Sequence, residues 1–200
     1  MVSTPNRSKK RILTAFQSLL GQKDYCDITV SEIIDQANVG KTTFYRHYER
    51  KLDLFVALHQ GVFSRLLEGY SAPDQWLDNQ PPPSVVNILD IINRESGFRR
   101  SMPYKLGNDW NQALRLLKGN LAKQIAVRLA EAFKAQRFDI EITELSGALA
   151  ALMIEIVVQV VEGPKLASAN GKATTLQRLI QAQVHASITL RCKPNGTGNP

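Results

Sequence analysis

The 20-residue stretch TVSEIIDQANVGKTTFYRHY, residues 29–48, decides the fold of this 200-residue chain. Thr29 followed by Glu32 is the spacing of a capping box, in which each side chain accepts a hydrogen bond from the other residue's backbone amide. A short helix is predicted to follow, with three residues facing inward: Ile33, Ile34 and Ala37. Residues 38–40 predict a tight turn, because asparagine tolerates the left-handed backbone conformation. A second short helix is expected over about 41–48.

Two short helices joined by such a turn, and held against a preceding helix, form a helix-turn-helix whose second helix can enter the DNA major groove. Short threonines can approach bases closely, while lysine, arginine, tyrosine and histidine can contact phosphates or base edges. The predicted DNA contacts are therefore Lys41, Thr42, Thr43, Tyr45, Arg46, His47 and Lys51, the last an exposed amine at the start of the next helix. Phe44 and Tyr48, four residues apart on one face, are assigned to the core. Three alternatives stay open: His47 as a core histidine, Tyr45 as a packing aromatic and Arg46 as a solvated surface residue.

The stretch resembles the DNA-binding motif of the TetR/AcrR family of bacterial transcriptional regulators, roughly T-V-x-x-I-A-x-x-A-G-V-S-x-G-T-F-Y-x-H-F with a lysine-rich start to the fourth helix. The resemblance covers about residues 7–70. Asn38, Gly40 and Thr42 depart from the pattern, which bears on the target sequence rather than on the mode of binding. The resemblance implies DNA contacts, mainly with phosphates, at Lys41, Thr43, Tyr45, His47 and Lys51, with Thr42 and Arg46 as additional contacts.

The positive charge of the chain lies mostly beside this motif. The formal net charge is +7, and residues 1–52 hold nine Lys/Arg against five Asp/Glu. A cluster of four basic residues precedes the motif: Arg7, Lys9, Lys10 and Arg11. Such a cluster is often a solvated tail, but beside a helix-turn-helix we expect it to flank the duplex.

The rest of the chain predicts an all-α protein, because apolar residues recur at helical spacing and no run alternates between apolar and polar. Helices are expected over about 7–20, 51–70, 84–95, 109–136, 141–162 and 174–192, and the polar, proline-rich stretch 71–83 predicts a loop. We expect a three-helix DNA-binding domain over 1–52, followed by a helical-bundle domain for ligand binding and dimerisation over 53–200.

Two helices of the second part predict a homodimer. The helix near 141–162 is apolar on nearly every face, so we expect it to be buried on every side, with one side against a partner subunit. The helix near 174–192 carries an apolar stripe that could complete a four-helix interface: Leu176, Leu179, Ile180, Val184 and Ile188. A monomer with a dense core is the alternative.

Aromatic and methionine side chains of the middle helices are the candidates for a small-molecule site: Phe98, Met102, Tyr104, Trp110, Phe133 and Met153. A pocket lined in this way favours an apolar or aromatic effector. Ordinary core packing is the alternative for any one of these residues.

Several classes of protein are disfavoured. The chain has no metal-ligand spacing, nucleophile motif or phosphate-binding glycine loop, so we predict no enzyme, metal or cofactor. The apolar run near 148–161 is short and interrupted, which argues against a membrane span, and no secretion signal is evident, so a cytoplasmic location with reduced cysteines is expected. The prediction is a TetR-like, ligand-responsive repressor that binds a palindromic operator as a homodimer. The alternative is a DNA-bound protein-interaction module without a small-molecule effector.

Overall fold

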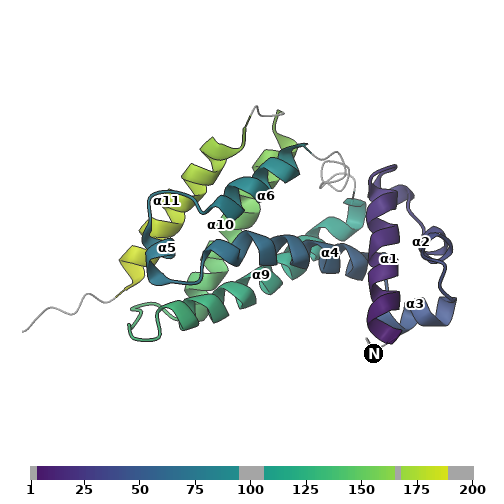
Figure 1. Cartoon of the computed structure of the whole chain (residues 1–200), viewed down its shortest axis with the longest axis horizontal. Coiled ribbons are helices and arrows are strands. Elements are labelled where there is room, and N and C mark those ends of the chain that lie inside the picture. The colour runs from purple at the N-terminus through teal and green to yellow at the C-terminus, as the bar shows by residue number, and fades with distance from the viewer. Residues whose placement is uncertain (1–3, 95–105, 165–167, 189–200) are drawn as a thin grey trace, which may run out of the picture.

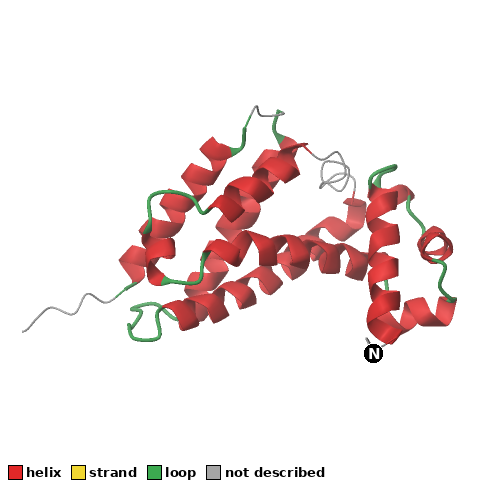
Figure 2. Cartoon of the chain, in the orientation of Figure 1, coloured by secondary structure: helices red, strands yellow, loops and turns green. Residues whose placement is uncertain are grey.

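The computed structural model describes residues 4–94, 106–164 and 168–188, and over these ranges the chain is all-α, as predicted (Figures 1 and 2). The α-helices are α1 (Thr4–Leu20), α2 (Val30–Ala37), α3 (Lys41–His47), α4 (Lys51–Leu66), α5 (Pro73–Leu77), α6 (Pro83–Arg94), α9 (Trp110–Ala132), α10 (Ile142–Glu162) and α11 (Asn170–Ser187). Short 3-10 turns lie at η1 (Tyr25–Asp27), η2 (Leu67–Gly69) and η3 (Gly107–Asp109).

Helices α1, α2 and α3 lie together at one end of the molecule, and the start of α4 packs against α1 (Figure 1). The buried face of α1 follows from helical spacing of apolar residues: Ile12, Ala15, Phe16, Leu19 and Leu20. The Phe16 ring meets Tyr25 edge-on with 6.3 Å between centroids, and Tyr25 meets Phe55 of α4 at 5.7 Å. This aromatic core holds α1 against α4 and leaves α2 and α3 on the outside.

The other helices form a second packed region. Helix α9 packs along α10, while α6 and α11 contact α10 and each other. A buried polar group ties α5 to α11: the Tyr70 hydroxyl donates to Gln177 Oε1 at 2.6 Å, and Gln177 Nε2 donates to the carbonyls of Gln75 and Asp78. The buried amide is thereby satisfied, as a polar group in a core must be.

The predicted loop over 71–83 is wrong in part, because it contains α5. Pro73 begins this helix, where a missing amide proton costs nothing. Trp76 is fully buried, and its ring lies 4.6 Å from that of Tyr70. A five-residue helix is too short to show periodicity, so the spacing of its apolar residues does not distinguish it from a linker.

The two predicted dimer helices differ in how much of their surface the chain itself covers. Half of the most apolar stretch of α10 is buried within the chain, and the prediction leaves one side of this helix for a partner subunit. The outward stripe is small and polar: Ala148, Ala151, Glu155 and Gln159. Much of the apolar stripe of α11 packs inside the chain instead, through Leu176, Ile180 and Val184. By length and composition α10 could span a membrane, but the core helix of a soluble protein passes the same test.

Candidate nucleic-acid interface

The capping box predicted for α2 is present. Thr29 is the N-cap, its hydroxyl accepts from the Glu32 amide at 3.3 Å, and the Glu32 carboxylate accepts from the Thr29 amide at 2.8 Å. Glu32 also pairs with Lys23, and these contacts, led by the Lys23 hydrogen bond, lower the pKa of Glu32 to about 2. The start of α2 is therefore fixed by local polar contacts.

The turn between α2 and α3 uses the predicted left-handed residue. Asn38 has φ 48° and ψ 56°, and among the described residues it is the only non-glycine with positive φ. Gly40 is the N-cap of α3 and provides no side-chain cap. Because glycine leaves the first amides of α3 without a side-chain acceptor, the orientation of this helix depends on the turn and on packing.

The inner face of α3 is the predicted one. Phe44 is fully buried and Tyr48 is 5% exposed, and burial raises the pKa of the Tyr48 hydroxyl to about 12. Their ring centroids lie 6.2 Å apart. Both residues anchor α3 to the core, so the opposite face is turned to solvent.

Four of the seven predicted contacts share that outer face and line one shallow hollow: Lys41, Thr42, Tyr45 and Arg46. Tyr45 is 48% exposed, and its ring is held edge-on to Phe44 at 5.3 Å between centroids. The side chains of Lys41 and Arg46 make no hydrogen bond or ion pair with any described residue. The hollow thus combines two unpaired cations, a hydroxyl and a phenol on one helix, which suits phosphates and base edges.

The other three predicted contacts are less accessible. Thr43 and His47 are half-buried, and His47 Nε2 is buried without a hydrogen-bond partner among the described residues. Lys51 differs from the expected exposed amine: it is half-buried, and its Nζ donates to the carbonyls of Tyr25 at 2.5 Å and Ile28 at 2.7 Å. Burial lowers the pKa of this ammonium.

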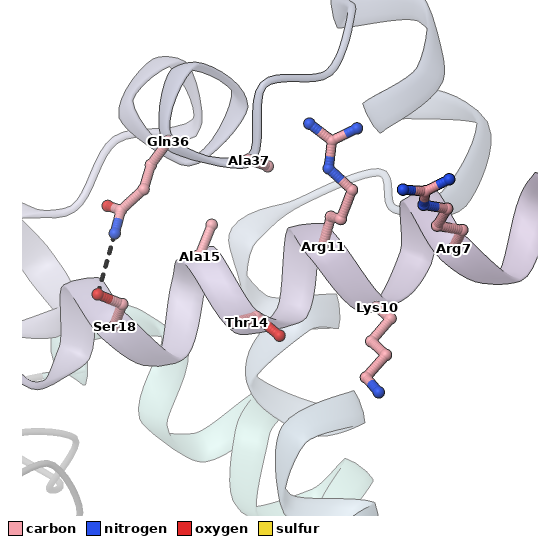
Figure 3. A pocket seen from close by; sticks show the side chains of 8 residues that line it. All are labelled: Arg7, Lys10, Arg11, Thr14, Ala15, Ser18, Gln36 and Ala37. Atoms are coloured by element: carbon pink, nitrogen blue, oxygen red, sulfur yellow. Dashed lines mark hydrogen bonds between the residues drawn. The ribbon is translucent and has the colours of Figure 1, made fainter.

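A second basic surface lies between α1 and α2, where an open groove is lined by Arg7, Lys10, Arg11, Thr14, Ala15, Ser18, Gln36 and Ala37 (Figure 3). Arg7 and Arg11 project toward the side of the α2–α3 turn, and Lys10 projects to the opposite side (Figure 3). Gln36 Nε2 donates to Ser18 Oγ at 3.0 Å, which ties α2 to α1. The basic cluster of the sequence is therefore divided between two sides of α1.

Sequence reasoning missed the contacts between distant segments. Arg11 Nη2 donates to the Asn38 carbonyl at 2.7 Å. The Tyr25 hydroxyl donates to Asp109 Oδ2 at 2.8 Å, and Arg50 Nη1 donates to Gln112 Oε1 at 3.3 Å, so both link the N-terminal helices to the start of α9. Burial, with help from Asp109, raises the pKa of Tyr25. No spacing rule pairs residues so far apart in the chain.

Two members of the predicted small-molecule set, Trp110 and Phe133, lie too far apart to line one small pocket together. Trp110 begins α9 and Phe133 is its C-cap, so a rise of 1.5 Å per residue separates them by about 34 Å. Phe133 instead packs on Phe138, with ring centroids 5.4 Å apart. Met153 is fully buried in α10 and Trp110 is half-buried. Phe98, Met102 and Tyr104 lie outside the described residues. Within the described ranges no group of three or more His, Cys, Asp or Glu side chains could hold a metal.

Comparison with known proteins agrees with the helix-turn-helix. Residues 12–58 match the family model for bacterial regulatory proteins of the tetR family. An uncharacterized HTH-type transcriptional regulator, YxbF of Bacillus subtilis, is 26% identical over 110 residues, which span 48% of this chain and only 29% of that protein. An uncharacterized HTH-type transcriptional regulator encoded in the lacX 3′ region of Lactococcus lactis is 25% identical over 138 residues, 62% of this chain and 68% of that protein.

The fold also resembles that of a solved TetR regulator, over nearly the whole chain. A TetR transcriptional regulator from Rhodococcus sp. RHA1 superposes with a TM-score of 0.62 at 16% identity, covering 91% of this chain and 97% of that one. At this identity the likeness shows the fold alone. Together, the family match over residues 12–58 and this likeness show a helix-turn-helix similar to that of the tetR family of bacterial regulatory proteins, within a fold similar to that of TetR regulators.

Proposed function

We propose that this protein is a ligand-responsive transcriptional repressor that binds a palindromic DNA operator as a homodimer in the cytoplasm. The observation that carries the proposal is the outer face of α3, where two cations without partners among the described residues flank an exposed tyrosine. The protein performs no catalysis in this proposal: its work is to bind DNA and to release it. Residues 1–52 serve the DNA, and residues 53–200 serve the partner subunit and the effector.

The DNA contacts are assigned by accessibility. Lys41, Thr42, Tyr45 and Arg46 meet base edges and phosphates in the major groove, and Thr43 contributes from the edge of that face. His47 contributes only with a change of ring orientation, because its Nε2 is buried. Arg7, on the side of the α2–α3 turn, meets a phosphate of the flanking DNA (Figure 3).

The homodimer uses the outer faces of α10 and α11. Alanines with two polar residues form the stripe on α10, and on α11 the exposed residues recur at the same helical spacing: Thr175, Leu179, Ala182 and Ala186. Leu179 is 43% exposed, and an added Cβ at Gly147 would meet nothing within 4 Å. Small residues permit close approach of two helices, so two helices from each subunit form a four-helix interface.

The effector binds in the second region and shifts the separation of the two α3 helices. Two copies of α3 across a two-fold axis read half-sites about one DNA turn apart, so a small change of separation weakens binding. The effector must therefore prefer the arrangement that does not fit the operator. Trp110 and Met153 are the described candidates for its pocket, and an apolar or aromatic molecule is the class that they favour.

The test is binding to duplex DNA, first to palindromes upstream of the protein's own and neighbouring genes and then to duplexes selected from a random-sequence pool. We expect a specific duplex whose affinity falls steeply between about 50 and 200 mM salt. Lys41→Ala and Tyr45→Ala should each weaken binding while circular dichroism stays unchanged. Lys123→Ala, on the exposed side of α9, is the matched control and should bind normally. If no duplex is selected, the proposal is wrong.

A further inference from the structure

We propose that Arg11 and Lys51 are positioning residues, which hold the two ends of α2 and thereby fix the angle of the recognition helix α3. The proposal rests on the proposed DNA-binding function, and it assigns to these two cations a role other than a phosphate contact. Each cation comes from a different helix, Arg11 from α1 and Lys51 from α4, and each donates to main-chain carbonyls beside one end of α2.

At the C-terminal end of α2, Arg11 holds the turn. Its guanidinium donates to the carbonyl of Asn38, the left-handed C-cap residue, at 2.7 Å. That carbonyl belongs to the peptide unit that joins Asn38 to Val39, and only Gly40 separates Val39 from α3. Since α3 has no side-chain N-cap, the orientation of this peptide unit strongly influences the direction in which the helix starts.

At the N-terminal end of α2, Lys51 holds the segment that precedes the N-cap Thr29. Its Nζ donates to the carbonyls of Tyr25 and Ile28 and lies 4.1 Å from the centroid of the Tyr25 ring. Two of the three ammonium protons are thus used on the main chain, and the ring face contributes a cation–π contact. Four groups raise the pKa against the effect of burial: Cys26, Asp109, Asp27 and Glu32.

The cations of α3 provide the contrast. The side chains of Lys41 and Arg46 are exposed and make no hydrogen bond or ion pair with the described part of the chain, so their donors are available to DNA. Lys51 has two of its donors committed to the protein, and Arg11 one. A positioning residue matters for the fit of α3 to particular bases, whereas a phosphate contact adds to the affinity for any sequence.

The experiment compares Arg11→Met and Lys51→Met with Lys41→Met as the matched phosphate-contact variant. Two duplexes are used: one selected by the wild-type protein from a random-sequence pool, and a scrambled duplex of equal length and composition. Each is titrated at about 50, 100 and 200 mM salt. For Arg11→Met and Lys51→Met we expect affinity for the selected duplex to fall about tenfold, with affinity for the scrambled duplex and the salt slope nearly unchanged. Lys41→Met should weaken both duplexes and lower the slope by about one.

The outcomes separate the alternatives. If Arg11→Met and Lys51→Met weaken both duplexes alike and lower the salt slope by about one, these residues contact phosphates and the inference is overturned. Unchanged affinity for the selected duplex also overturns it. Circular dichroism and thermal unfolding establish that each variant is folded, and because Arg11 is exposed on α1, Arg11→Met decides the matter if Lys51→Met does not fold. Failure to select any duplex with the wild-type protein would instead reject the proposed function.

Discussion

The two regions of the molecule are built by different means. Helices α2 and α3 are short, and polar contacts to main-chain atoms help to fix the ends of α2 and the turn before α3: a capping box, a cation on a turn carbonyl and a lysine on two further carbonyls. The longer helices α9, α10 and α11 are held mainly by buried aliphatic side chains, and the buried Gln177 is among the polar contacts that join them to their neighbours. The difference indicates that a recognition helix needs a defined orientation, which directional hydrogen bonds provide. Apolar packing, which is non-directional, provides most of the stability.

The largest expected effect separates the two faces of α3. Phe44→Ala should lower the free energy of unfolding by about 3–5 kcal/mol, because it removes a fully buried ring from the core. Its neighbour Tyr45 is half exposed, so Tyr45→Ala should change stability far less and weaken DNA binding instead. Urea unfolding measures the stability of the two variants, and duplex titration measures their DNA affinity. Equal loss of stability in both variants would contradict the assignment of inner and outer faces.

The next effect concerns the exposed stripe of the second region. Ala151→Glu places a carboxylate on the outer face of α10, where the proposed dimer would bury it, at a cost of about 3 kcal/mol or more. We expect dissociation to monomers in sedimentation equilibrium, with an unchanged circular dichroism spectrum. Val127→Glu, at a residue 58% exposed on α9, is the control and should leave the assembly intact. A dimer that tolerates Ala151→Glu would place the interface elsewhere.

These two regions also differ in how far the sequence predicts them. The Thr29–Glu32 spacing, the Asn38 turn and the inward Phe44 are local features, and the structure has each of them. The start of α6 and the bounds of α10 fall within one residue of expectation for the same reason. The sequence spacing predicts these features because each depends on residues that lie within one or two helical turns of each other.

Contacts between distant segments could not be predicted from the spacing of residues in the sequence. Nothing in the spacing distinguishes a lysine that reaches a phosphate from Lys51, which folds back on carbonyls 23 and 26 residues away. Trp110 and Phe133 share aromatic character, yet the length of α9 separates them. An apolar stripe does not indicate whether it packs on its own subunit or on a partner: Leu176, Ile180 and Val184 of the α11 stripe pack inside the chain, whereas Leu179 is 43% exposed.

A pH effect tests the apolar character of the second region. His59 lies in α4, its ring 4.1 Å from that of Phe55, and burial lowers its pKa to about 4. The unfolded chain takes up this proton near pH 6.5 and the folded protein only near pH 4, so stability is full above pH 6.5 and is lost as the pH falls toward 4. The loss is up to about 3 kcal/mol, at about 1.4 kcal/mol per pKa unit.

His59→Phe should flatten the stability profile between pH 6.5 and 4, measured by urea unfolding at several pH values. His185→Gln, at an exposed histidine of α11, is the matched control and should keep the wild-type profile. If His59→Phe follows the wild-type profile, His59 is not the group that titrates on unfolding.

The smallest effect concerns the hydrogen bond from Tyr25 to Asp109, which links the N-terminal helices to the start of α9. Tyr25→Phe keeps the ring contacts with Phe16 and Phe55 but removes the hydroxyl that donates to Asp109. A hydrogen bond to a carboxylate contributes about 1.5–3 kcal/mol, and since Asp109 is only half-buried and water can replace the donor, we expect a loss of about 1 kcal/mol in urea unfolding.

The second contact between the N-terminal helices and the start of α9, from Arg50 to Gln112, provides the comparison. Arg50→Ala removes an exposed hydrogen bond to Gln112 and a 3.9 Å ion pair with Asp53, and it should cost less than about 0.5 kcal/mol. If Tyr25→Phe is as stable as the wild-type protein while Arg50→Ala is not, the exposed contact joins the regions and the buried one does not. The expected order would instead make Tyr25, whose hydroxyl meets Asp109 and whose carbonyl accepts from Lys51, the stronger of the two links between the N-terminal helices and the start of α9.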